Sequence, residues 1–268
     1  MNPTHSPAGA YLGTVTGLPD LLQHLQKASP PWRELRAVCF DVFGTLLTYQ
    51  SEAGADLLPS LNLPARQLMR GELSTAPRPM TAHAAHAFLL QREGVDTTDY
   101  ARLAMTSRFD DHPRSSSELD VARWHFEQLS ARLPGAPRLA VDTVAVLAAM
   151  LLRELGTVRW IESDSAERLL AIASLFNHYD PPRLGVCSNL AAPFAIRVAT
   201  LLQAVIPATQ QVLSSNVGYV KPDPMIYQIV ADRLGVRASD ILFVGDKQLE
   251  DVAGPIAYGM RAAHMVRR

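Results

Sequence analysis

Polar residues that could do chemistry follow four short apolar runs of the sequence. In chain order these groups are Asp41-Val42-Phe43-Gly44-Thr45, Ser188-Asn189, Lys221-Pro222-Asp223-Pro224, and Gly245-Asp246 followed by Asp251. They combine carboxylates, a hydroxyl group and a lysine, which are residue types that can hold a hard divalent cation and a phosphoryl group. The spacing therefore raises the question of whether the fold brings the four groups together.

The carboxylates of Asp41, Asp246 and Asp251 would need cations if they met at one site. Two unit charges about 4 Å apart repel by roughly 4 kcal/mol at an effective dielectric constant of about 20. Lys221 supplies one positive charge, and a divalent cation such as Mg²⁺ would supply the rest. In such a site the cations neutralise a phosphoryl group while Asp41 attacks it in line.

The elements that could position these groups form an alternating pattern. Five apolar runs, the last of them weaker, are typical of strands buried on both faces of a parallel sheet: 36–41, 183–189, 211–215, 241–246 and 261–266. Helical patterns lie between the later runs, at 165–176, 192–204 and 224–234. The sequence therefore predicts a Rossmann-like, doubly wound α/β sheet, in which ligands bind beyond the carboxyl ends of the strands.

The segment between the first two runs is much longer than one crossover helix requires. It contains four helical patterns, at 80–92, 98–108, 117–132 and 140–155, and Ser117 with Asp120 is typical of a helix start. We therefore predict an α/β core formed by residues 34–50 and 159–268, interrupted by a helical insertion at 51–158. Residues 1–33 are predicted to be an N-terminal extension with a short helix at 18–27.

Composition narrows the class of protein. Of the 268 residues, 48% are hydrophobic and 19% are charged, and the net charge is −1, so we expect a globular protein without an electrostatic preference for nucleic acid or an anionic membrane. No apolar run is long enough to span a bilayer, and no secretory signal is recognisable. The two cysteines lie inside apolar runs. These features favour a cytoplasmic protein that acts on a small molecule.

The four groups together resemble the motifs of the haloacid dehalogenase-like (HAD) hydrolase superfamily, in the same order and across the whole core. The resemblance implies that Asp41 is the nucleophile of a covalent aspartyl intermediate. It implies that Mg²⁺ is held by Asp41, the backbone carbonyl of Phe43 and Asp246, and that Asp251 completes or supports the metal site. The insertion at 51–158 is similar to the helical cap of this superfamily, which closes over the site.

The same resemblance assigns residues to the substrate. Ser188 and the backbone of Asn189 would hold the transferred group, and Lys221 would balance its charge. Gly44 and Thr45 belong to the loop that the substrate approaches, and Gly44 allows close approach of the backbone. The substrate-binding set is therefore Gly44, Thr45, Ser188, Asn189 and Lys221, with Asp41, Ser188 and Lys221 as catalytic residues.

One position departs from the phosphatase pattern. Phosphatases of the superfamily usually carry an aspartate acid–base two residues after the nucleophile, where this chain has Phe43. Three interpretations stay open: a phosphatase or phosphotransferase that uses an activated leaving group or an acid from the cap, a metal-independent 2-haloacid dehalogenase, and a pseudo-enzyme that binds without turnover. A phosphonatase would need a cap lysine, and no lysine lies between Lys27 and Lys221. Asp246 favours the metal-dependent interpretation.

Other polar residues have ordinary structural interpretations. Asp223 is expected to cap a helix, because prolines flank it at a helix start. His83 and His86 lie three residues apart on a predicted helix and are expected to be surface or core residues, although either could supply the missing proton. Glu250 lies beside Asp251 and could compete with it for the metal.

Overall fold

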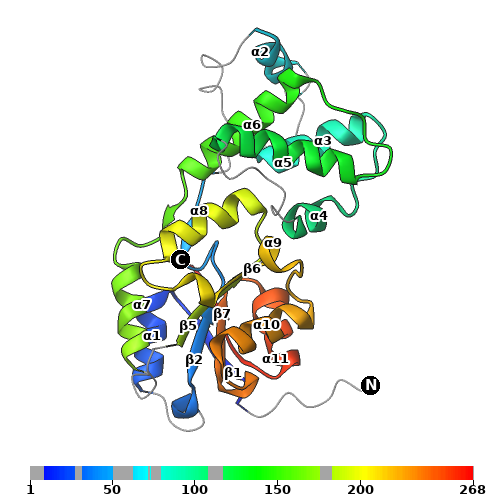
Figure 1. The fold of residues 1–268 in the computed structure, drawn as a ribbon. Coiled ribbons are helices and arrows are strands. Elements are labelled where there is room, and N and C mark those ends of the chain that lie inside the picture. The colour runs from blue at the N-terminus through cyan, green and yellow to red at the C-terminus, as the bar shows by residue number, and fades with distance from the viewer. Residues whose placement is uncertain are drawn as a thin grey trace. The chain divides into compact units, whose positions relative to one another are not determined.

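The computed structural model describes residues 9–27, 32–50, 63–71, 73, 80–107, 117–175 and 183–267 (Figure 1). The chain divides into two compact units. The first consists of residues 1–48, 159–189 and 198–268, and the second of residues 49–158 and 190–197. Among the described residues, no helix is both long and apolar enough to cross a membrane.

The first unit contains a six-stranded parallel sheet. Its strand order is β1-β8-β7-β2-β5-β6. The strands are β1 (Tyr11–Val15), β2 (Ala37–Phe40), β5 (Arg183–Ser188), β6 (Gln211–Leu213), β7 (Ile241–Gly245) and β8 (Arg261–Met265). All five predicted strands are present, and the predicted Rossmann-like α/β fold is confirmed.

Helices flank this sheet. In Figure 1, α1 (Leu18–Gln26) and α7 (Ser165–Ser174) lie on one side of the sheet, and α10 (Pro224–Leu234) and α11 (Gly254–Tyr258) lie on the other. Two short elements follow strands: α9 (Ser214–Val217) comes after β6, and the π-helix η5 (Gln248–Ala253) comes after β7. Three 3₁₀ turns precede strands: η1 (Trp32–Glu34), η3 (Ala208–Gln210) and η4 (Ala238–Asp240) lead into β2, β6 and β7. Helix α8 (Ala192–Leu202) crosses the division between the units.

The central strands are buried because both of their faces are covered. Every residue of β2 and of β7 is buried, which is what the continuous apolar runs predict for interior parallel strands. Phe243 of β7 packs edge-to-face on Tyr227 of α10, with ring centroids 5.9 Å apart. This rigid layer holds the strand ends, and the residues that follow them, in fixed relative positions.

The predicted extension at 1–33 needs correction over its described part. Strand β1 pairs with β8 as the edge of the sheet, and α1 packs beside α7, so residues 11–26 belong to the α/β unit. The strand is only partly buried and carries Gly13, and these features remove the continuous apolar run by which the interior strands are recognised. The predicted helix at 18–27 is present as α1.

The chain leaves and re-enters the first unit through a short strand pair. Strand β3 (Leu47–Thr48) pairs antiparallel with β4 (Arg159–Trp160). The division between the units falls after Thr48 and after Val158. Residues 190–197 also belong to the second unit, although they were predicted to belong to the α/β core. The predictions for residues 1–8, 28–31 and 51–62 lie outside the described residues.

The second unit is helical in the part that the structure describes. Its helices are α2 (Leu63–Arg70), α3 (Ala82–Arg92), α4 (Tyr100–Thr106), α5 (Glu118–Arg132) and α6 (Val141–Gly156), and α6 packs against α2, α3 and α5. Helix α5 starts with the predicted capping arrangement, in which the Ser117 hydroxyl accepts from the Asp120 N–H at 3.2 Å. Helix α2 was not predicted.

Candidate active site

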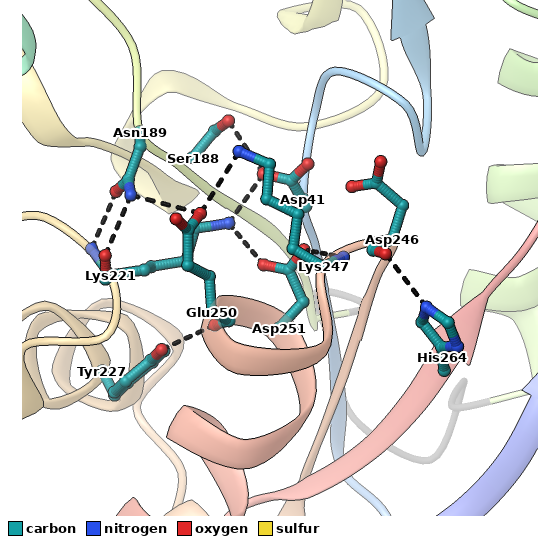
Figure 2. Close-up of polar contacts among 10 residues, drawn as sticks. All are labelled: Asp41, Ser188, Asn189, Lys221, Tyr227, Asp246, Lys247, Glu250, Asp251 and His264. Carbon is teal, nitrogen blue, oxygen red and sulfur yellow. Dashed lines mark hydrogen bonds and ion pairs between the residues drawn. The ribbon is translucent and has the colours of Figure 1, made fainter. Parts of the chain in front are cut away.

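The four polar groups meet at the carboxyl edge of the parallel sheet. Asp41 directly follows β2, Ser188 ends β5, and Asp246 directly follows β7. Since β2 lies between β5 and β7, these three side chains come from adjacent strands and from the same edge (Figure 2). Lys221 and Asp251 reach the same place from the loop before α10 and from η5.

Asp41 is a buried carboxylate with two donors on one oxygen. The Ser188 hydroxyl donates to Oδ1 at 2.9 Å, and Lys221 Nζ donates to the same oxygen at 2.7 Å. The backbone N–H of Asp41 donates to the Val244 carbonyl at 2.8 Å, which fixes the residue to the neighbouring strand β7. No hydrogen-bond partner of Oδ2 occurs among the described residues. The carboxylate is therefore oriented through Oδ1 and keeps Oδ2 for other chemistry.

Lys221 bridges two carboxylates inside the protein. Its ammonium group lies 2.7 Å from Asp41 Oδ1 and 2.6 Å from Asp251 Oδ1, and its side chain is only 1% exposed. Burial by itself would lower the pKa of Lys221, but the carboxylates of Asp41 and Asp251 raise it well above its usual value. The lysine therefore stays charged, as the predicted charge-balancing role requires.

The backbone of Lys221 is clamped by Asn189. Asn189 Oδ1 accepts from the Lys221 N–H at 2.7 Å, and Asn189 Nδ2 donates to the Lys221 carbonyl at 3.0 Å. This double hydrogen bond ties the end of β5 to the loop that carries the lysine. The predicted contact of the Asn189 backbone with substrate stays a prediction, and the structure gives the Asn189 side chain a separate, positioning role.

Asp41, Asp246 and Asp251 can share one metal ion. Each offers one carboxylate oxygen, and these three oxygens lie within 4.8 Å of one another. Asp246 Oδ1 is buried and has no hydrogen-bond partner among the described residues. A buried, unpartnered carboxylate oxygen is costly unless a cation binds it. The donor set is all oxygen and carries negative charge, so it fits a hard divalent cation such as Mg²⁺.

The pKa values of the two later carboxyl groups reflect this crowding. Burial, and then the negative charge of Asp41, raises the pKa of Asp246. Burial also raises the pKa of Asp251 to about 6; Lys221 opposes this rise and Asp41 adds to it. Both groups would become easier to ionise beside a cation.

Two glycines make room for this cluster. Gly44 has a φ of +86°, and a Cβ at this position would collide with the carboxylate of Asp246. A Cβ on Gly245 would likewise collide with the Asp251 side chain. These positions therefore require glycine if the carboxylates are to approach each other.

The other members of the predicted site lie in the loop after β2. Phe43 forms a β-bridge with Leu47, and its predicted role as a carbonyl ligand stays a prediction. Thr45 is fully buried, and its hydroxyl has no hydrogen-bond partner within the described part of the chain. Substrate binding by Gly44 and Thr45 also stays a prediction.

The competing carboxylate, Glu250, has other partners. Its Oε2 lies 3.3 Å from Lys247 Nζ and 3.4 Å from Asn189 Nδ2, and the Tyr227 hydroxyl donates to its backbone carbonyl at 2.6 Å.

Asp251 Oδ2 accepts from the Lys247 N–H at 3.0 Å, which directs Oδ1 to Lys221. Asp251, and not Glu250, is the residue of η5 that joins the carboxylate cluster. Tyr227 could not be predicted as part of the site, because a tyrosine on an apolar helix face resembles any core residue.

The remaining structural interpretations are confirmed. The Asp223 carboxylate caps α10 by accepting from the Met225 N–H at 2.9 Å. His86 is buried in the second unit, with Nδ1 2.8 Å from the Tyr100 hydroxyl and Nε2 2.9 Å from the Ser130 hydroxyl. His83 Nε2 lies 2.8 Å from His125 Nε2. Both histidines are therefore engaged inside the helical unit.

The sequence of the chain also matches a family model. The model of the haloacid dehalogenase-like hydrolases matches residues 35–259, which is most of the chain. The chain belongs to the haloacid dehalogenase-like hydrolase family. No sequence among the curated proteins matches it significantly.

Solved structures with a similar fold include both dehalogenases and phosphatases. A 2-haloacid dehalogenase from Pseudomonas syringae pv. tomato DC3000 has 20% identity and a TM-score of 0.48, with 85% of each chain covered. A HAD phosphatase from Thermococcus onnurineus has 21% identity and a TM-score of 0.48, with 87% of each chain covered. An L-2-haloacid dehalogenase from Xanthobacter autotrophicus has 21% identity and a TM-score of 0.45, covering 86% of this chain and 77% of its own. These similarities do not choose between the two reactions.

Proposed function

We propose that this HAD-family hydrolase carries out Mg²⁺-dependent hydrolysis or transfer of a phosphoryl group from a small molecule, through an aspartyl intermediate on Asp41. The observation that carries the proposal is the state of Asp246: its Oδ1 is buried, has no hydrogen-bond partner in the part of the chain that the structure describes, and lies in the same cluster as Asp41 and Asp251. A divalent cation would supply the partner that this buried oxygen needs.

The charges of the cluster support a divalent cation. Three carboxylates meet here, and Lys221 neutralises one unit of their charge through ion pairs with Asp41 and Asp251. The other nearby lysine, Lys247, pairs with Glu250 instead. Among the described residues no further ion pair to the three carboxylates occurs, which leaves two negative charges without an ion-pair partner, and this equals the charge of one Mg²⁺ ion.

The residues of the site have complementary roles in this reaction. Asp41 Oδ2 attacks phosphorus, and the bond between phosphorus and the leaving oxygen breaks with its electron pair going to that oxygen. Lys221 and Ser188 hold the opposite oxygen of Asp41 and so fix the direction of attack. Water then attacks phosphorus, releases inorganic phosphate and restores Asp41. When bound, Mg²⁺ supplies the positive charge that offsets charge on the transferred group.

The leaving group is restricted by Phe43. An aliphatic alkoxide needs a proton as it leaves, and a phenyl side chain cannot supply one. We therefore expect faster turnover of phosphate esters or anhydrides whose leaving group is a weak base. The same residue favours the second candidate, hydrolytic dehalogenation of a 2-haloacid through an ester on Asp41, because a halide leaves without a proton.

Metal dependence separates these candidates. Purified protein would be assayed on aryl phosphates and on small 2-haloacids, with Mg²⁺ or with a chelator. We expect activity on the phosphates that the chelator removes, no turnover by Asp41→Asn, and loss of phosphatase activity in Asp246→Asn. Asp223→Asn is the matched control, because Asp223 only caps α10.

The outcomes are distinct. Haloacid turnover that survives both the chelator and Asp246→Asn would establish the dehalogenase instead. A folded protein that is inactive on both panels would contradict both candidates and favour a pseudo-enzyme.

A further inference from the structure

The end of the chain, beyond residues 35–259 that match the family model, contacts both loops of the proposed metal site. His264 on β8 lies beside Gly245 on β7 in the parallel pairing. Its Nε2 is 2.9 Å from the backbone carbonyl of Asp246, and its Nδ1 is 2.9 Å from Gln248 Nε2 (Figure 2 shows the first of these contacts). A carbonyl oxygen can only accept, so Nε2 carries the proton and Nδ1 accepts from Gln248.

Arg267 makes the corresponding contacts to the loop of the nucleophile. Its Nε donates to the Gly44 carbonyl at 2.8 Å, and Nη2 donates to the Thr45 carbonyl. Its Nη1 lies 3.5 Å from Glu162 Oε1. One guanidinium group therefore holds two successive carbonyls next to Asp41, and an acidic partner orients that guanidinium group.

The N-terminal strand holds this end of the chain in place. Strand β8 lies between β1 and β7, and the Val266 N–H donates to the Val15 carbonyl at 2.9 Å. Arg267 follows directly. Strand β1, which lies outside the family match, therefore fixes the backbone from which both contacting side chains project.

The two contacted loops approach each other closely. The space at Gly44 is so narrow that a Cβ there would meet the carboxylate of Asp246. Arg267 holds the carbonyl of Gly44 on one side of this approach, and His264 holds the carbonyl of Asp246 on the other. If either hydrogen bond lengthened, the loop that it holds could shift, and the distance between the carboxylates of Asp41 and Asp246 would change.

We propose that His264 and Arg267 are positioning residues that fix the loops of Asp41 and Asp246 at the spacing needed to bind one divalent cation. The inference rests on the proposed function, because it assigns the metal to that site. It goes beyond the proposed function because it makes metal affinity depend on strands β1 and β8.

The first test follows amide hydrogen exchange in metal-free protein and needs no activity. The loops contain hydrogen-bonded amides that report on opening, among them Gly44 N–H to the Leu47 carbonyl at 3.0 Å and Lys247 N–H to Asp251 Oδ2 at 3.0 Å. We expect Arg267→Met to speed exchange in peptides covering 44–47, and His264→Leu to speed exchange in peptides covering 247–251, each by about tenfold.

Arg261→Met is the matched control. Arg261 lies on β8, the strand of His264, but it donates to the Ser239 carbonyl at 3.1 Å and lies over the Trp32 ring. We expect this variant to leave exchange in both loops unchanged. Unchanged exchange in the loops of the His264 and Arg267 variants, or equal acceleration by Arg261→Met, would overturn the proposal. Should Arg267→Met fail to fold, Arg267→Lys keeps the charge with a single donating nitrogen and is expected to give a smaller acceleration in 44–47.

The second test measures Mg²⁺ binding by calorimetry, beside the urea midpoint without metal. A positioning role predicts a dissociation constant for Mg²⁺ that rises about tenfold in both variants and is unchanged in Arg261→Met. A merely structural role predicts a lower urea midpoint with unchanged Mg²⁺ affinity, and this result would contradict the proposal. If wild-type protein binds no Mg²⁺, the proposed function fails, and the exchange experiment alone still supports or overturns the positioning role.

Discussion

Replacing Lys221 with methionine removes the charge that two buried carboxylates share. At the observed distances of 2.7 and 2.6 Å, each ion pair is worth about 6 kcal/mol at an effective dielectric constant of about 20. Desolvation of the ammonium and carboxylate groups offsets much of this attraction, but loss of one partner leaves buried charge, which typically costs about 3–5 kcal/mol. Asp41 retains the Ser188 hydroxyl and Asp251 retains the Lys247 N–H, so we expect a loss of about 3 kcal/mol at pH 8.

The loss should depend on pH in a defined direction. The pKa of Asp251 is raised to about 6 from an ordinary value of 3.8, chiefly by burial, and Lys221 is the group that opposes this rise. Without Lys221 the pKa rises further. A carboxyl group whose folded pKa exceeds its unfolded pKa binds more protons when folded, so its contribution to stability falls as pH rises through that window. The variant should therefore be closest to wild type near pH 5 and furthest from it above pH 7.

The assay is a series of urea titrations between pH 5 and pH 8 in buffer with a chelator. Lys247→Met is the matched control, because Lys247 is 56% exposed in its side chain and pairs with Glu250 at 3.3 Å. Such a surface pair contributes less than about 1 kcal/mol. Equal losses in the two variants, or a loss in Lys221→Met that grows as pH falls, would refute the electrostatic reasoning.

Three further changes have defined outcomes. Gly44→Ala should fold but weaken Mg²⁺ binding at least about tenfold in calorimetry, because the Cβ meets the Asp246 carboxylate at a positive φ; unchanged affinity would contradict this. Burial raises the pKa of Glu154 to about 8 even though its carboxylate accepts from the Ala82 N–H, so wild-type protein should lose up to about 5 kcal/mol of stability as pH rises from about 4.5 to about 8. Glu154→Gln should remove this pH dependence in urea titrations, and a wild-type stability that is flat across this window would refute the prediction. Phe43→Asp should speed hydrolysis of alkyl phosphates by about 10²-fold or more while leaving aryl phosphates less affected, and no gain on any alkyl ester would show that another group already supplies the proton.

The interior of the fold could be predicted because its physical signal is local. Strands β2, β5 and β7 lie inside the sheet, so both of their faces must be apolar, and their sequences are short runs of apolar and small residues. Strand β1 lies at the edge of the sheet, with Tyr11 45% exposed and Gly13 in its middle, and its sequence carries no such run. Its place depends on pairing with β8, more than two hundred residues away, which no local pattern reveals.

The candidate site follows the same division. Asp41, Ser188 and Asp246 could be predicted because each lies at the carboxyl end of a recognisable strand, and the carboxyl ends of parallel strands meet at one edge of the sheet. Asn189 could be expected at the site, but not its clamp on the backbone of Lys221, which depends on the conformation of a loop. His264 and Arg267 contact the site through the backbone carbonyls of Asp246 and Gly44. Every residue carries a carbonyl, so no side-chain pattern in the sequence marks these contacts.

The site also shows why a count of charges in the sequence is not sufficient. Two lysines lie near three aspartates, so a simple tally leaves one negative charge unmatched. In the structure Lys247 pairs with Glu250, and Lys221 is fully used by Asp41 and Asp251. The unmatched charge is therefore larger than the tally suggests. Asp246 contributes to it with a buried Oδ1 that has no donor among the described residues. The distribution of partners, more than the number of charges, is what gives the cluster the charge and oxygen donors that suit a divalent cation.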